Sequence, residues 1–196
     1  ETRFAAQVAD SAVFTVGAVL GVRPQTEKFV DLVKAHNLSC LICVTKMDRE
    51  RADFQKTVDG IRESTGLNPV VLYLPIGAED QFKGVVDIMA KKAGMFADSG
   101  KTTLADVPAD LAAEAATLRE NMMEYVAETN DDLLEKFLEE GELTDEELNT
   151  GLAAAIKNAQ VAPVCACASL TNLGSSVVLD AIANLLPSPD QRPARV

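Results

Sequence analysis

The sequence predicts an α/β fold, in which a parallel sheet with flanking helices is interrupted by an inserted α+β subdomain. At both ends of the chain, short apolar strands alternate with amphipathic helices, the pattern of parallel strands joined by helical crossovers. In the middle, this alternation gives way to closely spaced strands and then to a run of helices. The expected units are residues 1–66 with 161–190 for the parallel sheet, residues 67–160 for the inserted subdomain, and a linker at 191–196.

The first unit is expected to hold two buried strands and two helices. Residues 12–16 and 38–45 are apolar runs of strand length. Residues 24–36 and 51–65 carry apolar side chains at helical spacing. Gly66 follows the second of these helices and suits the left-handed position at which many helices end.

The middle of the chain is expected to form three strands followed by three helices. The last of these helices begins with Thr-Asp-Glu-Glu at 144–147, a capping box in which two side chains satisfy two backbone N–H groups. The strand–helix pattern of the first unit then returns at 162–166 and 176–186. The elements expected in the middle are strands at 69–76, 82–89 and 93–97 and helices at 109–128, 131–138 and 144–158.

The acidic charge of the chain is concentrated in one segment. Residues 98–157 contain 16 Asp and Glu against 4 Lys and Arg, which accounts for the whole formal net charge of −12. Such a surface repels phosphate backbones and disfavours direct nucleic-acid binding, whereas it attracts a basic protein partner. Charge runs of this kind also occur simply as solvated helix faces, and the sequence alone leaves both interpretations open.

The four cysteines are expected to be reduced thiols in the protein core. Cys40 and Cys43 lie in one apolar strand-like run, and Cys165 and Cys167 lie in another. Zinc ligands usually lie on turns, where four sulfurs converge, whereas strand residues three apart point to opposite faces. We therefore expect no metal site and a reducing, cytoplasmic location. No apolar run approaches the roughly 20 residues of a membrane helix, so no membrane contact is expected.

The strongest chemical signal is Thr45-Lys46-Met47-Asp48, directly after a buried strand and before a helix. It has the form of the Asn/Thr-Lys-x-Asp motif that recognises guanine. An aspartate carboxylate can accept hydrogen bonds from both N1–H and the exocyclic amine of guanine, a pair of donors that adenine lacks. The aliphatic stem of Lys46 can lie along the base plane. The alternative is a polar turn in which Asp48 caps the following helix.

A second element of such a site would be a short loop of small residues after the last strand. Ala168, Ser169 and Leu170 occupy that place, and the backbone N–H of Ser169 is the expected donor to guanine O6. Taken alone, this segment is an ordinary strand-to-helix loop. No residue pattern predicts a nucleophile with its base, which disfavours an unrelated α/β enzyme. The predicted guanine-binding residues are Thr45, Lys46, Asp48, Ala168, Ser169 and Leu170.

Five segments, in order, resemble the elongation factor G family of translational GTPases, and together they span nearly the whole chain. The third and fourth are similar to the insertion typical of these factors, which makes the resemblance more specific than the guanine motif alone. The segments are GVRPQTE at 21–27, VTKMDR at 44–49, LPIGAE at 74–79, FKGVVD at 82–87 and LLPSP at 185–189.

The resemblance implies a partial P-loop GTPase G domain that retains three parallel strands and their helices. It also implies a parent protein that binds GTP or GDP with Mg²⁺, hydrolyses GTP and acts in ribosomal translocation. The acidic insertion would then dock on the ribosome and its stalk protein. An alternative is a protein-docking module that binds a basic stalk partner without nucleotide activity. Thr45 stands where many members have Asn, and Ala168-Ser169 where Ser-Ala is usual, which also fits an elongation-factor-G-like paralogue.

The phosphate-binding half of such a domain has no counterpart in the sequence. Residues 94–102 imitate a Gly-x-x-x-x-Gly-Lys-Ser/Thr loop but carry five residues between the glycines, and a turn is expected at 98–101 instead. Residues 1–10 resemble the helix that follows the family's Asp-x-x-Gly segment. We therefore expect no catalytic residue, no metal ligand and no tightly bound nucleotide. Without the preceding strands, the edge beside residues 13–16 would be free, so self-association through it is expected.

Overall fold

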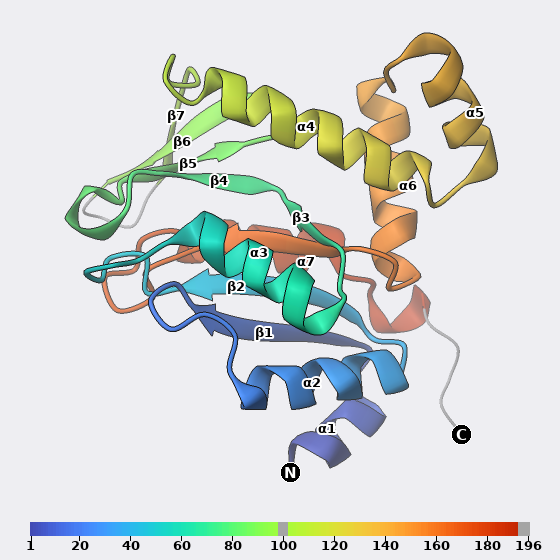
Figure 1. Cartoon of the computed structure of the whole chain (residues 1–196), viewed down its shortest axis with the longest axis horizontal. Coiled ribbons are helices and arrows are strands. Elements are labelled where there is room, and N and C mark those ends of the chain that lie inside the picture. The colour runs from blue at the N-terminus through green and yellow to red at the C-terminus, as the bar shows by residue number, and fades with distance from the viewer. Residues whose placement is uncertain (98–101, 192–196) are drawn as a thin grey trace.

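The computed structural model describes residues 1–97 and 102–191, and its centre is a parallel sheet of four strands (Figure 1). The strand order is β1-β2-β8-β3. Neighbouring strands pair in parallel, with Val16 beside Val44 and Val44 beside Ala166. The predicted α/β class with a parallel sheet is therefore confirmed. The strands are β1 (Ser11–Gly17), β2 (Ser39–Thr45), β8 (Ala162–Ala166) and β3 (Pro69–Val71).

The prediction of three parallel strands is wrong, because β3 joins this sheet from a run expected to belong to the insertion. The run at 69–76 is two strands: β3 pairs with β8, and β4 (Tyr73–Ile76) pairs within a second sheet. Leu72 lies between them and bonds to both sheets. Its N–H donates to Val164 O at 3.2 Å, and its C=O accepts from Ile88 N–H at 3.0 Å. An unbroken apolar run gives no sign of this change of partner.

The second sheet is antiparallel, with the order β4-β5-β6-β7. The expected strands at 82–89 and 93–97 are confirmed, with shifted ends, as β5 and β6. The pattern does not predict β7, because all its side chains are exposed and show no alternation of buried and exposed positions. The turn predicted at 98–101 lies outside the described residues. The remaining elements here are β5 (Gly84–Asp87), β6 (Lys92–Phe96), β7 (Thr102–Ala105) and the 3₁₀ turn η1 (Glu79–Gln81) between β4 and β5.

Helices cover both faces of the parallel sheet, as the alternation of strand side chains requires. On one face, Ile42 shares a core with Val33 of α2 and Val58 of α3. On the other face, Leu41 packs with Ala181 of α7. Figure 1 shows α2 and α3 in front of the sheet and α7 behind it. The bounds are α1 (Thr2–Val8), α2 (Pro24–Ala35), α3 (Phe54–Thr65), α7 (Ser175–Leu185) and the 3₁₀ turn η2 (Pro189–Gln191).

Arg119 joins α4 and α6 to the segment that follows β5 in the second sheet. It donates to the carbonyls of residues 88–89 at 3.2 and 3.4 Å and forms an ion pair with Asp145 of α6. Its side chain is only 12% exposed, so these partners replace the water that the guanidinium loses. The capping box at the start of α6 is confirmed, with reciprocal bonds between Thr144 and Glu147. The helices are α4 (Ala112–Ala127), α5 (Asp131–Glu140) and α6 (Asp145–Lys157).

The second sheet and α4 to α6 follow β3 and precede β8 in the chain. They occupy most of the segment expected to be inserted, although β3 shows that its first residues belong to the parallel sheet. The division into units at residues 67 and 160 stays a prediction. So does the linker at 191–196, of which residues 192–196 lie outside the described part.

The apolar runs that contain the cysteines form internal strands. Cys40 and Cys43 lie in β2, Cys165 lies in β8, and Cys167 follows β8 directly. All four thiols are free and buried. In the part of the chain that the structure describes, no helix is both long enough and apolar enough to span a bilayer.

Strand β1 lies at the edge of the described sheet, where it pairs with β2 alone. We predict that two copies of the chain associate through this edge, because unpaired N–H and C=O groups beside apolar side chains favour strand addition. Sedimentation velocity should show a concentration-dependent dimer that Val13→Lys disperses. Val19→Lys is the control, since both valines are 40% exposed but only Val13 lies in the strand. A wild-type chain that stays monomeric at high concentration would contradict the prediction.

Candidate base-recognition site

Three loops meet at the carboxyl edge of the parallel sheet, because parallel strands end on the same side. Backbone hydrogen bonds join the loops. Asp53 N–H donates to Ala18 O at 3.0 Å, and Met47 N–H donates to Cys167 O at 3.3 Å. Open α/β sheets commonly bind ligands at this edge. The loops are residues 18–23 after β1, residues 46–53 after β2, which we call the recognition loop, and residues 167–174 after β8, which we call the β8 loop.

The recognition loop presents Lys46 and Asp48 on either side of a buried Met47. Met47 is 0% exposed, whereas Lys46 is exposed and Asp48 is half-buried. Lys46 has a φ of 62°, a left-handed conformation that is uncommon outside glycine and turns the chain at the end of β2. Thr45 is half-buried, and its hydroxyl lies 3.5 Å from Val16 O, so it faces β1.

The alternative role of Asp48 as a helix cap is wrong. Helix α3 begins at Phe54, and its N-cap is Asp53, whose Oδ1 accepts from Lys56 N–H at 2.9 Å. The N–H of Asp53 in turn donates to Ala18 O at 3.0 Å. Within the described residues, no hydrogen bond or ion pair occupies the Asp48 carboxylate. It is therefore available to a ligand.

The β8 loop is a turn that exposes the four residues 169–172. Ala168 N–H donates to Leu173 O at 2.8 Å, and Leu173 N–H returns a bond to Ala168 O at 3.1 Å. Ala168 is buried, whereas Ser169 is exposed and Leu170 is 82% exposed. Across residues 1–97 and 102–191, the N–H of Ser169 finds no acceptor. Gly174 ends the turn at a φ of 77°, where a Cβ would lie 2.7 Å from a carbonyl oxygen of β8.

The six residues predicted to bind guanine are thus brought to one edge of the sheet by two loops that share a hydrogen bond. Ala168 is buried, Thr45 and Asp48 are half-buried, and Lys46, Ser169 and Leu170 are exposed. Contact of these residues with a base stays a prediction.

A pair of thiols, which the sequence pattern assigns only to the core, lies beneath both loops. Cys43 Sγ and Cys167 Sγ are 3.3 Å apart, and Cys167 Sγ is 3.4 Å from Ser169 Oγ. The hydrogen bond from Cys43, helped by Ser169, lowers the pKa of Cys167 to about 7, and the same contact raises the pKa of Cys43. The Asp48 carboxylate opposes this lowering of the Cys167 pKa. The negative charge of Asp48 therefore acts on Cys167, the first residue of the β8 loop.

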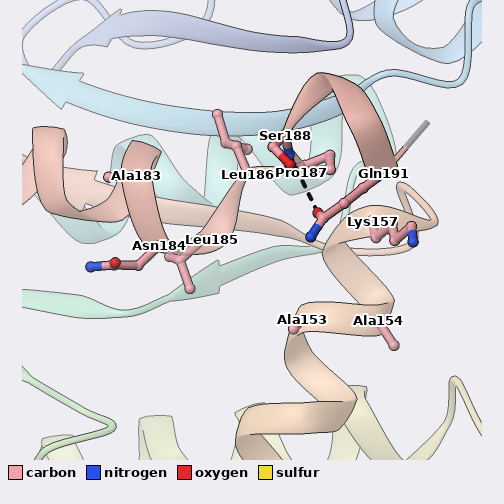
Figure 2. Close-up of a pocket in the computed structure, with 10 residues that line it drawn as sticks. All are labelled: Ala153, Ala154, Lys157, Ala183, Asn184, Leu185, Leu186, Pro187, Ser188 and Gln191. Carbon is pink, nitrogen blue, oxygen red and sulfur yellow. Dashed lines mark hydrogen bonds between the residues drawn. The ribbon is translucent and has the colours of Figure 1, made fainter.

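A cavity of about 360 Å³ lies elsewhere, between α6 on one side and the end of α7 with the segment that follows it on the other (Figure 2). Lys157 is the one ionisable residue of its described wall, and Ser188 N–H donates to Gln191 Oε1 at 3.3 Å on one side of it. Such a wall offers no carboxylate to read guanine and no cluster of titratable groups. The lining residues are Ala153, Ala154, Lys157, Ala183, Asn184, Leu185, Leu186, Pro187, Ser188 and Gln191.

Comparison with known proteins gives one family and a solved structure of similar fold. The family model described as the elongation factor Tu GTP binding domain matches residues 1–188. A crystal structure of a protein from Thermus thermophilus superposes with a TM-score of 0.88 and 29% sequence identity, over 98% of this chain. The chain spans 29% of the length of that protein.

Ionisation of Cys167 is predicted to increase the free energy of unfolding between about pH 7 and pH 9. Because its folded-state pKa of about 7 lies below the ordinary 9.0, the folded chain releases this proton at lower pH than the unfolded chain. The resulting contribution to the free energy of unfolding is complete above pH 9 and is lost as the pH falls through about 7. Urea unfolding at these two pH values measures the prediction. The free energy of unfolding should increase more from pH 7 to pH 9 in the wild type than in Cys167→Ser.

The ultraviolet absorbance of the thiolate measures the same ionisation directly. Cys43→Ala removes the hydrogen bond that lowers the pKa of Cys167 most, so the Cys167 titration should move to higher pH. Cys40→Ala is the control, because this buried thiol lies on the same strand without that contact. An unchanged titration in Cys43→Ala would show that the thiol pair does not set the pKa.

Proposed function

The chain belongs to the elongation factor Tu GTP-binding domain family, and on that premise we propose that it contributes the guanine-recognising part of a translational GTPase. The finer proposal is a factor of the elongation factor G type or a close paralogue. Five sequence segments support it, as does the second sheet with α4 to α6 between β3 and β8. GTP hydrolysis coupled to ribosomal translocation would be the activity of a longer parent protein.

The proposed reading of the base uses donors and acceptors that guanine alone complements. The Asp48 carboxylate would accept from N1–H and the 2-amino group of guanine, and the N–H of Ser169 would donate to O6. Adenine presents an acceptor at N1 and a donor at C6. The Asp48 carboxylate would therefore face another acceptor, and the Ser169 N–H would face another donor. The stem of Lys46 would cover one face of the base.

A single hydrogen bond carries this proposal: the one from Met47 N–H to Cys167 O at 3.3 Å. It places the loop that bears Asp48 beside the loop that bears Ser169, as recognition of neighbouring groups on one edge of a base requires. The N–H of Ser169 and the carboxylate of Asp48 have no partner among the described residues, so both are available to a ligand.

The family implies a guanine nucleotide, usually with Mg²⁺. Among the described residues, we propose contacts only for the base, by Lys46, Asp48 and Ser169. Among residues 1–97 and 102–191, no three His, Cys, Asp or Glu side chains could hold a metal ion together, and we propose no residue of this part as a Mg²⁺ ligand. We assign no step of hydrolysis to these residues. Binding of the base alone gives modest affinity, so a dissociation constant for GDP of roughly millimolar is expected.

A second candidate function, protein docking, is favoured by the acidic surface of α5 and α6. Most acidic side chains of these helices are exposed, and a groove of about 560 Å³ between them has Asp132 and Glu146 in its wall. The helices are held together by an ion pair between Lys136 and Glu147 at 2.6 Å. We propose that this face attracts a basic protein, for which the ribosomal stalk is the candidate within the finer proposal.

Replacing one carboxylate oxygen by an amide should change which base the site prefers. Asp48→Asn presents a donor where guanine has its 2-amino donor, but xanthine has an oxygen there. We expect the wild type to prefer GDP over XDP, and Asp48→Asn to prefer XDP over GDP, each by roughly tenfold. Titrations of the two proteins with GDP, XDP and ADP, followed by NMR, measure these preferences.

The matched control for this experiment is Asp53→Asn. Asp53 lies in the same loop but caps α3, and Asn is an equally good cap. Its preference for GDP should remain that of the wild type. Equal binding of GDP and ADP by the wild type, or an unchanged preference in Asp48→Asn, would count against guanine recognition.

The docking proposal predicts salt-dependent capture of a basic stalk-protein domain. Binding should be measurable at low ionic strength and weaken as salt screens the charges, since the screening length is about 10 Å at 0.1 M. Asp132→Lys with Glu146→Lys should weaken binding, because both residues line the acidic groove. Glu63→Lys, an exposed site on α3, is the control. Absence of binding by the wild type at low salt would refute the proposal.

A further inference from the structure

We infer that Glu79, in the turn between β4 and β5, positions the recognition loop and thereby sets its affinity for the base. The inference rests on the proposed guanine site, to which it adds a residue from the second sheet. Glu79 does not touch the candidate base position itself. It acts through the backbone of the loop that carries Lys46 and Asp48.

Two hydrogen bonds connect Glu79 to the recognition loop. Its N–H donates to Met47 O at 2.8 Å, and its Oε1 accepts from Arg51 N–H at 2.7 Å. The N–H of Met47 is already bonded to Cys167 O. Both backbone groups of Met47 are therefore fixed, one by the β8 loop and the other by Glu79, and the residues on either side of it bear the groups that would read the base.

The conformation of the recognition loop explains why it needs such support. Lys46 and Arg51 have φ values of 62° and 66°, in the left-handed region that side chains other than glycine seldom adopt. Residues in this region persist where surrounding bonds over-determine them. The carboxylate of Glu79 bonds the N–H of one of these two residues, so it holds the far turn of the loop in place. The end of the loop is fixed separately, by Asp53 N–H to Ala18 O at 3.0 Å.

The turn that presents Glu79 is itself built closely. Gly77 has a φ of 77°, and a Cβ at this position would lie 2.1 Å from Gln81 O, so only glycine fits. Gln81 N–H donates to Ala78 O at 3.0 Å, and Lys83 N–H donates to Ile76 O at 3.1 Å. These bonds close the turn between the end of β4 and the start of β5. The second sheet thus delivers Glu79 to the recognition loop in a defined orientation.

Three variants separate positioning from general stability. Glu79→Ala removes the acceptor for Arg51 N–H, whereas Glu79→Gln keeps an oxygen that can accept the same bond. Asp80→Ala is the matched control, because it removes the same charge from the next exposed residue, which has no hydrogen bond or ion pair within the described part. The readouts are amide hydrogen exchange of Arg51 without ligand, affinity for GDP, and the midpoint of urea unfolding.

We expect Glu79→Ala to speed exchange of the Arg51 amide by about tenfold and to weaken GDP binding roughly 3- to 10-fold, with the unfolding midpoint close to that of Asp80→Ala. Glu79→Gln should restore most of the slow exchange at Arg51 and most of the affinity for GDP. Equal GDP affinity in Glu79→Ala and Asp80→Ala, or a loss that Glu79→Gln does not recover, overturns the inference. If the wild type binds no GDP, the proposed function fails by itself. Unchanged exchange at Arg51 in Glu79→Ala then overturns the positioning role as well, and faster exchange supports it.

Discussion

The arrangement of the candidate site depends on the backbone of Met47. Its N–H bonds to the β8 loop, its C=O accepts from the turn between β4 and β5, and its side chain is fully buried. Because this residue is held from three directions, the backbone that carries Lys46 and Asp48 on either side of it is fixed in place. A ligand that meets groups already in position loses less affinity to the ordering of the protein.

The second sheet is joined to the parallel sheet by a continuous series of hydrogen bonds. Arg119 of α4 donates to Ile88 O, Ile88 N–H donates to Leu72 O, and Leu72 N–H donates to Val164 O in β8. The acidic helices therefore have a fixed position relative to the strand that leads into the β8 loop. A rigid connection does not by itself couple the acidic helices energetically to the candidate guanine site. Such coupling would need two alternative arrangements of the elements that connect them.

Several features of the fold could be predicted because their causes are local. The helix starts and ends follow from caps such as the Thr144–Glu147 box, and the faces of β2 follow from its alternation of side chains. The two wrong interpretations share another cause. Residues 69–76 form one apolar run but two strands, and Asp48 precedes the helix that Asp53 caps. In each case residues that look equivalent in the sequence are distinguished by partners distant in the chain.

By itself, the sequence determined that this protein has a parallel α/β sheet and that one segment carries its acidic charge, and it supplied the residues that we propose for guanine. Periodicity, composition and the hydrogen-bonding groups of side chains are properties of short segments, so they are visible without a fold. Only the tertiary structure decided that β3 belongs to the parallel sheet, that Cys43 meets Cys167 and that Glu79 holds Arg51. These contacts join residues 28 to 124 positions apart, and no local pattern specifies which distant groups the packing of two sheets brings together.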